Sequence, residues 1–240
     1  MTDREPPTQP DRLGAISALS EPTRRALYEH VAATGDWVSR DQAADAVGLE
    51  RGTAAHHLDR LAADGLLDVA YQRLSGRRGP GAGRPAKLYR RSRRQFEVSL
   101  PPRDYELAGH LLARAADKSR SESVDITSAL DDVARAEGRR LAEEVRARLP
   151  RAHGRPAASR RRVVLDVLEH HGFEPRADDD GTVVLQNCPF HQLAQQHREL
   201  ICGMNHCLLD AAIENVGQTG LVARLEREAG LCCVKLRPAP

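Results

Sequence analysis

The sequence lacks long hydrophobic runs, and its first residues are not apolar. No run of about 18 apolar residues occurs, so we predict no membrane-spanning helix. Residues 1–10 are polar and proline-rich, without the hydrophobic core of a secretory signal. We therefore expect these ten residues to form a disordered tail, and we expect the protein to act in the cytoplasm without a membrane partner.

Cysteine is absent from residues 1–187. The number of cysteines after that point is odd and no secretory signal precedes them, so a disulfide framework is not expected. Clustered thiols in a reducing compartment more often bind a metal or respond to redox change. The five positions are Cys188, Cys202, Cys207, Cys232 and Cys233.

Acidic residues are missing from residues 73–94, which contain nine lysine and arginine residues. The whole chain has a formal net charge of only +2, so this positive charge is local. Glycines and prolines indicate a hairpin tip between two strand-like segments, 69–74 and 87–90. A local cationic hairpin is typical of a surface that contacts nucleic-acid phosphates.

Just before this hairpin, the sequence shows the pattern of two short helices joined by a tight turn. Ser39 and Gln42 have the spacing of a capping box, and Gly48 permits the left-handed backbone that ends a helix. A second helix is predicted from Arg51 to Asp64, with apolar residues on one face and polar residues on the other. Two helices followed by a cationic hairpin predict a winged helix that binds double-stranded DNA. The predicted DNA-binding residues are Arg51, Thr53, His56, His57, Arg60, Arg77, Arg78, Arg84 and Lys87.

The rest of the chain predicts two further regions, and the fold class is α+β. After a winged helix-turn-helix domain over residues 11–100, residues 101–150 have helical periodicity. We expect them to form a helical linker and a homodimer surface, because a winged helix on two-fold half-sites needs a partner. The alternative is that their apolar stripe packs within one subunit. Residues 151–240 predict a small α+β sensor domain.

Three cysteines are candidate ligands of a soft metal. Cys188 lies in a proline-containing turn, Cys202 on a helix predicted over 192–215, and Cys232 on the last strand. Alternation along a strand lets only one of Cys232 and Cys233 face an inner site, and we choose Cys232. Three thiolates suit an iron–sulfur cluster or zinc, whereas the alternative is that the cysteines only fill the core. The possible fourth ligands are His206, His191 and Cys207.

Residues 11–95 resemble the ArsR-like winged-helix domain. Leu19 to Arg25 resembles the entry to its second helix, and His57-Leu58 resembles part of its recognition helix. Gly83 to Tyr89 resembles the wing of one branch, the SufR-like repressors, as do the segments around the last cysteines. This resemblance implies a cytoplasmic dimer that carries a [4Fe–4S] cluster on C-terminal cysteines. The branch has a further cysteine where residues 215–221 of this chain have none.

Together these patterns predict a DNA-binding transcriptional regulator, a repressor by resemblance, whose DNA affinity is set by a metal or an iron–sulfur cluster. The alternative is a regulator whose C-terminal domain binds a ligand or a protein and holds no metal. We do not expect an enzyme, because spacing places no activating base beside Cys188.

Overall fold

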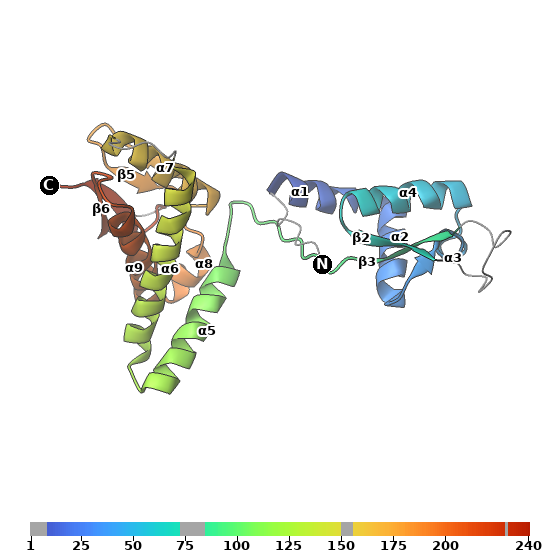
Figure 1. Ribbon diagram of the computed structural model, residues 1–240, viewed down its shortest axis with the longest axis horizontal. Helices are drawn as coiled ribbons and strands as arrows, with labels where there is room; N and C mark the ends of the chain where they lie inside the picture. Colours follow the sequence, from blue (N-terminus) through green and yellow to red (C-terminus); the bar gives the residue numbers. More distant parts are fainter. Residues whose placement is uncertain (1–8, 73–84, 150–155, 229) are drawn as a thin grey trace. The chain divides into compact units, whose positions relative to one another are not determined.

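The computed structural model describes residues 9–72, 85–149, 156–228 and 230–240 (Figure 1). The chain divides into two compact units, the first ending at Val98 and the second beginning at Ser99. Each unit combines helices with a small antiparallel sheet, so the predicted α+β class is confirmed. Among the described helices, none has the length and apolar character needed to cross a bilayer.

The first unit packs four helices around a three-stranded antiparallel sheet with the order β1-β3-β2. Helix α1 begins at Gln9, so the expected disordered tail is wrong for Gln9 and Pro10. Pro10 is tolerated there because the first turn of a helix does not need its backbone N–H. The elements are α1 (Gln9–Ala18), α2 (Pro22–Thr34), β1 (Val38–Ser39), α3 (Arg40–Val47), α4 (Arg51–Ala63), β2 (Leu67–Gln72) and β3 (Ala86–Arg91).

Local sequence signals set the ends of α3 and α4. The side chain of Ser39 accepts a hydrogen bond from the Gln42 backbone, and Gln42 accepts one in return, as a capping box requires. Gly48 follows α3 with φ +71°, in the left-handed region. Glu50 precedes α4 but makes no capping hydrogen bond, so α4 depends on its packing. Leu58 and Leu61 of α4 are fully buried against Leu27 and Val31 of α2, which makes the helix pair one rigid core.

The second unit covers one four-stranded antiparallel sheet with helices, and the strand order is β4-β5-β7-β6. The helix predicted over 192–215 is two helices in the structure, because the backbone leaves the helical region at His197 (φ −128°, ψ 53°). The longer of the two, α9, is buried on both sides, as its sequence indicates. The elements are α5 (Tyr105–Glu122), α6 (Ile126–Arg148), α7 (Ala157–His170), β4 (Pro175–Ala177), β5 (Val183–Leu185), α8 (His191–Gln196), α9 (Arg198–Val216), β6 (Leu221–Leu225) and β7 (Val234–Pro238).

Helices α5 and α6 are not a separate linker, since α6 packs along α9 within the second unit. Gly138 allows this close approach, because a Cβ atom there would lie 2.2 Å from the backbone oxygen of Leu208. The apolar stripe of α6 is buried, including Leu130 and Leu141, and belongs to the core that α9 shares. The stripe therefore packs within one subunit, and the homodimer surface stays a prediction.

Candidate nucleic-acid interface and cysteine cluster

Helix α4 presents an open polar face. Arg51, Thr53, His56 and Arg60 are all exposed. The Nε atom of Arg51 lies 2.8 Å from an Asp41 carboxylate oxygen, and Arg51 keeps 73% of its side chain exposed. Exposed ion pairs of this kind contribute little to stability, so the arginine is able to exchange its carboxylate for a phosphate. The exposed face has the donors that base edges and phosphates accept.

Arg60 has the same kind of pairing at the other end of α4. Its Nε atom lies 3.0 Å from Asp64, one helical turn away, and 62% of its side chain is exposed. The guanidinium remains accessible, and a planar fork of donors suits a guanine edge or a phosphate. Arg51 and Arg60 therefore place one cation near each end of the exposed face.

His57 is the exception on this helix, because it is half-buried and lies away from the open face. Its Nδ1 atom is 3.8 Å from an oxygen of Glu21, the residue that caps α2. Hydrogen bonds from the backbone N–H groups of Thr23 and Arg24 lower the pKa of Glu21 to about 2. In the described structure, His57 packs against the start of α2.

Lys87 is also tied to the protein. Its Nζ atom lies 2.7 Å from an Asp59 oxygen, and only 20% of its side chain is exposed. Asp59 belongs to α4, whereas Lys87 belongs to β3, so the pair fastens the wing strand to the helix. A cation neutralised in this way has less to offer a phosphate than its place in the sequence indicates.

The Lys87–Asp59 pair is part of a network that the sequence analysis missed. The hydroxyl of Tyr89 donates to Asp59, and Arg40 Nε donates to the Tyr89 oxygen at 3.1 Å. Burial raises the pKa of Tyr89 to about 12, and the bond to Asp59 adds to this effect. Burial also acts to raise the pKa of Asp59, but hydrogen bonds from Lys87 and Tyr89 outweigh it and lower that pKa. One signal in the sequence could have revealed this network. Asp59 is an acidic residue on a helix predicted to bind DNA, where an unpaired carboxylate would repel phosphates.

Arg77, Arg78 and Arg84 lie outside the described residues, so their predicted role in DNA binding stays a prediction. From the described part of the cationic segment, Arg90 stacks over the Trp37 ring at 4.5 Å from its centroid. This cation–π contact holds β3 beside the residue that precedes β1. The base of the predicted wing is therefore attached to the helical core at two places, Trp37 and Asp59.

Four of the five cysteines meet in the second unit as two pairs. Cys202 forms a disulfide with Cys233, and the Cys188 and Cys232 thiols lie close enough to shift each other's pKa. The Nδ2 atom of Asn205, on α9, donates to the Cys232 sulfur at 3.3 Å. The structure thus brings the three predicted ligands together, and it adds Cys233.

Cys233 was set aside because neighbours on a strand point to opposite faces. That rule applies only inside a strand, and β7 begins at Val234. Cys232 and Cys233 lie in the bend before β7, so each can reach a different partner near α9. Strand alternation was therefore the wrong criterion for choosing between them.

The two thiols of the Cys188–Cys232 pair have pKa values shifted in opposite directions. The hydrogen bond from Cys232 is the main cause that lowers the pKa of Cys188, and the Phe190 backbone N–H and the Arg103 charge add to it. The same bond and burial raise the pKa of Cys232. Cys188 is therefore the more acidic thiol of the pair.

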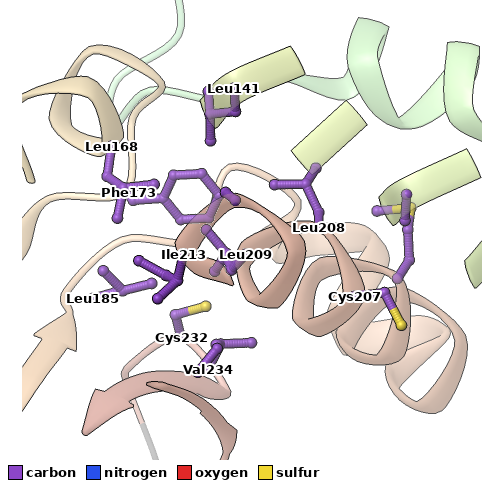
Figure 2. Close-up of a cluster of buried hydrophobic side chains, with 14 of the residues drawn as sticks. Leu141, Leu168, Phe173, Leu185, Cys207, Leu208, Leu209, Ile213, Cys232 and Val234 are labelled. Carbon is purple, nitrogen blue, oxygen red and sulfur yellow. The ribbon is translucent and has the colours of Figure 1, made fainter. Parts of the chain in front are cut away.

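Of the three candidate fourth ligands, His191 contacts the pairs through its backbone, whose N–H donates to the backbone oxygen of Cys188 at 3.1 Å. Cys207 is buried on α9, and burial with the nearby negative charge of Asp131 raises its pKa to about 11. Figure 2 shows the Cys207 side chain apart from Cys232, which lies beside Val234. His191 contacts Gln195, and His206 is half-buried on α9.

The donor set suits a soft metal only when the disulfide is reduced. A sulfur bonded to another sulfur is not a thiolate, and metals bind cysteine as the thiolate. Consistent with this, no three histidine, cysteine or acidic side chains in the described residues are arranged to hold a metal ion. Reduction would leave four thiols around one end of α9.

The Cys188 turn is bonded directly to the residues that open the second unit. Asn187 donates to the backbone oxygen of Pro102 at 2.8 Å and to that of Gly172 at 2.6 Å. Arg103 donates to Asn187 and, at 3.3 Å, to the backbone oxygen of Cys188. We name Arg103 and Asn187 the clasp. Sequence analysis missed it because neither residue belongs to a periodic or repeated pattern.

Comparison with protein-family models matches residues 19–70 to a helix-turn-helix domain. The comparisons with curated proteins and with solved structures gave no match. The matched range contains α2, α3 and α4, and α4 carries the exposed polar face. Residues 19–70 are therefore a helix-turn-helix domain of the kind found in DNA-binding transcriptional regulators.

Proposed function

We propose that the protein is a cytoplasmic transcriptional repressor that binds DNA as a homodimer and whose DNA affinity depends on the state of its four paired cysteines. The observation that carries the DNA-binding part is the exposed polar face of α4 inside the matched domain. In this proposal α4 enters the major groove, and Arg77, Arg78 and Arg84 contact phosphates and the minor groove. Two-fold related half-sites supply the reason for a second copy.

Cys202 supports the proposal that the cysteines set DNA affinity, because it can be either a disulfide partner or a metal ligand. In the disulfide form it is bonded to Cys233, so the start of α9 is tied to the bend before β7. Formation of this bond from two thiols requires a two-electron oxidant, for example a hydroperoxide, which is reduced to an alcohol and water. Reduction frees Cys202 and Cys233 beside the free thiols Cys188 and Cys232. Four cysteines, once deprotonated, are the ligand set that zinc and iron–sulfur clusters take. The resemblance to SufR-like repressors favours the cluster, with Cys233 in place of the missing family cysteine.

The clasp supplies a route from the cysteines to the DNA-binding domain. The Cys188 thiol lies beside Cys232, and the backbone oxygen of Cys188 accepts a hydrogen bond from Arg103. Arg103 lies four residues after Ser99, where the second unit begins. A change at the sulfur atoms that moves the Cys188 turn would therefore move the segment that leads to the first unit.

A second candidate is favoured by the Cys202–Cys233 bond itself. In this case the second unit holds no metal, and reversible formation of the disulfide alone sets DNA affinity. Metal analysis separates the two candidates. Protein purified without oxygen should contain iron and sulfide if a cluster is present, stoichiometric zinc if zinc is bound, and neither if the disulfide acts alone.

The DNA-binding proposal is tested with duplexes that the full-length protein selects from a random library. We expect an enriched inverted repeat, bound at least about a thousandfold more tightly than unselected duplex at the same salt concentration. Fluorescence anisotropy measures both affinities. Equal affinity for selected and unselected duplexes would refute sequence-specific regulation.

The sensing proposal is tested by measuring affinity for the selected duplex with reduced and with peroxide-treated protein. Cys202→Ser should abolish the difference between the two states, because it removes one partner of the disulfide. Cys207→Ser is the matched control, since Cys207 lies on the same helix and is a free thiol in the described structure. If Cys202→Ser still responds to peroxide, the sensing proposal is contradicted. The DNA-binding proposal would still stand, because the duplex selection tests it independently.

A further inference from the structure

A groove of about 400 Å³ lies between α5 and α6 of the second unit. The two helices run side by side as a hairpin (Figure 1). Val133 and Ala136 of α6 form its apolar lining, and both are at least partly buried. Its volume falls in the range of small-molecule sites, about 300–1,000 Å³. None of its residues belongs to α4, to the cysteine pairs or to the clasp.

Four cations surround this groove. Arg114 and Lys118 come from α5, and Arg135 and Arg139 come from α6, whereas Asp132 is its acidic lining residue. Within each helix the two cations are four residues apart, so they lie on the same face, about 6 Å apart along the axis. Two cationic pairs thus face one another across the groove.

The carboxylates nearby neutralise these cations only in part. Arg114 lies 3.9 Å from Glu137, but Glu137 is held more closely by Arg140, whose Nε donates to it at 2.8 Å. Arg135 lies 3.8 Å from Asp210. These two distances are too long for good hydrogen bonds, so the donors of both arginines stay available.

The other two cations differ in how they are paired. Lys118 has a close partner, with its Nζ atom 3.0 Å from Asp132. In the described part of the chain, no carboxylate lies within ion-pair distance of Arg139, which is exposed. Lys118 is therefore the only one of the four whose charge is well compensated.

We propose that this groove binds a small anion with two or more phosphate groups, such as a nucleoside polyphosphate. Arginine guanidinium groups present a planar set of donors that matches phosphate oxygens, and three of them line the groove. Two cationic pairs set across a groove fit a chain of phosphates better than a single carboxylate. The apolar lining gives room for an uncharged part of the same molecule.

The test is a calorimetric titration of full-length protein with sodium tripolyphosphate at low salt. The double variant Arg135→Gln/Arg139→Gln should bind about tenfold more weakly than the wild-type protein, because it loses two charge-assisted contacts. Arg120→Gln is the matched control, as Arg120 is an exposed arginine of α5 outside the groove. The control should bind like wild type.

A second variant, Asp132→Asn, should change the affinity for tripolyphosphate in the opposite direction. It removes the acidic lining residue and leaves Lys118 with only the more distant Glu122, at 3.5 Å, so we expect tighter binding, by about threefold. The cationic segment 73–94 can also bind tripolyphosphate, but that binding would be the same in all four proteins. Equal affinity in wild type and the double variant, or no binding by wild type, would overturn the proposal. Circular dichroism should show unchanged helix content, since the substituted side chains are exposed.

Discussion

The two units differ in where their candidate functional side chains lie. The first unit shows them on the surface, where Arg51 and Arg60 stand on one exposed helix face. The second unit buries them, since Cys188 and Cys232 are 7% and 2% exposed and come from different segments of the chain. A surface for a duplex must be open, whereas a sulfur site must be enclosed to control its chemistry. The comparison indicates that substitutions can alter the exposed face and the buried cysteines separately.

The largest effect is expected from Gly138→Ala, which adds a Cβ atom where the backbone of α9 leaves no room. We expect it to lower the free energy of unfolding of the second unit by about 1–3 kcal/mol. Gly109→Ala is the control, because a Cβ atom there meets open space and alanine favours the helix by about 0.5–1 kcal/mol. Denaturant unfolding measures both. Equal stabilities would show that α6 and α9 are not closely packed.

The second-largest effect concerns the exposed face of the first unit and is measured as affinity for DNA. Arg60→Ala should weaken binding to the selected duplex about tenfold and reduce its salt dependence, because a cation on the exposed face is lost. Asp64→Asn removes the paired carboxylate instead, so it should leave binding equal or tighter. Anisotropy titrations at several salt concentrations measure both. Weaker binding by both variants would mean that the substitutions disturb α4 and not a DNA contact.

A smaller effect is expected where the wing strand joins α4. Tyr89→Phe removes the buried hydroxyl that donates to Asp59 and should cost the first unit about 1 kcal/mol. Tyr28→Phe is the control, since Tyr28 lies on α2 outside the network. Thermal unfolding compares the two. An equal loss in both would argue against the network as the attachment of β3.

The smallest effect concerns the cap of α2 and depends on pH. The folded pKa of Glu21 is about 2, below its ordinary value of 4.5, so its carboxylate stabilises the folded state above pH 4.5. This contribution is lost as the pH falls from 4.5 to 2. Glu21→Gln should therefore unfold at a lower temperature than wild type at pH 7, with the gap closing in that window. Glu29→Gln, on the exposed side of α2, should show no such gap.

Local patterns could predict much of the first unit. The Ser39 and Gln42 capping box, the left-handed Gly48 and the buried face of α4 are properties of neighbouring residues, and the structure has all of them. Lys87 and His57 could not be placed in this way. Each faces a carboxylate from another element, Asp59 or Glu21, and sequence distance does not show which carboxylate is near.

The second unit was predictable in its elements but less so in its contacts. The α+β class of residues 151–240 and the helix that carries Cys202 follow from sequence patterns. The pairing of Cys202 with Cys233, and the clasp between Arg103 and Asn187, join residues 31 and 84 positions apart. Such contacts depend on how the elements pack, so only the folded chain could assign them.

The sequence by itself determined the α+β class, the helix pair with its polar face, and the gathering of every cysteine in the last quarter of the chain. The tertiary structure alone decided which cysteines are partners and which cations stay open to a ligand. The physical reason is the distance along the sequence over which each interaction acts. Helix periods and caps act over a few residues, whereas sulfur pairs, ion pairs and grooves arise where distant segments are packed together.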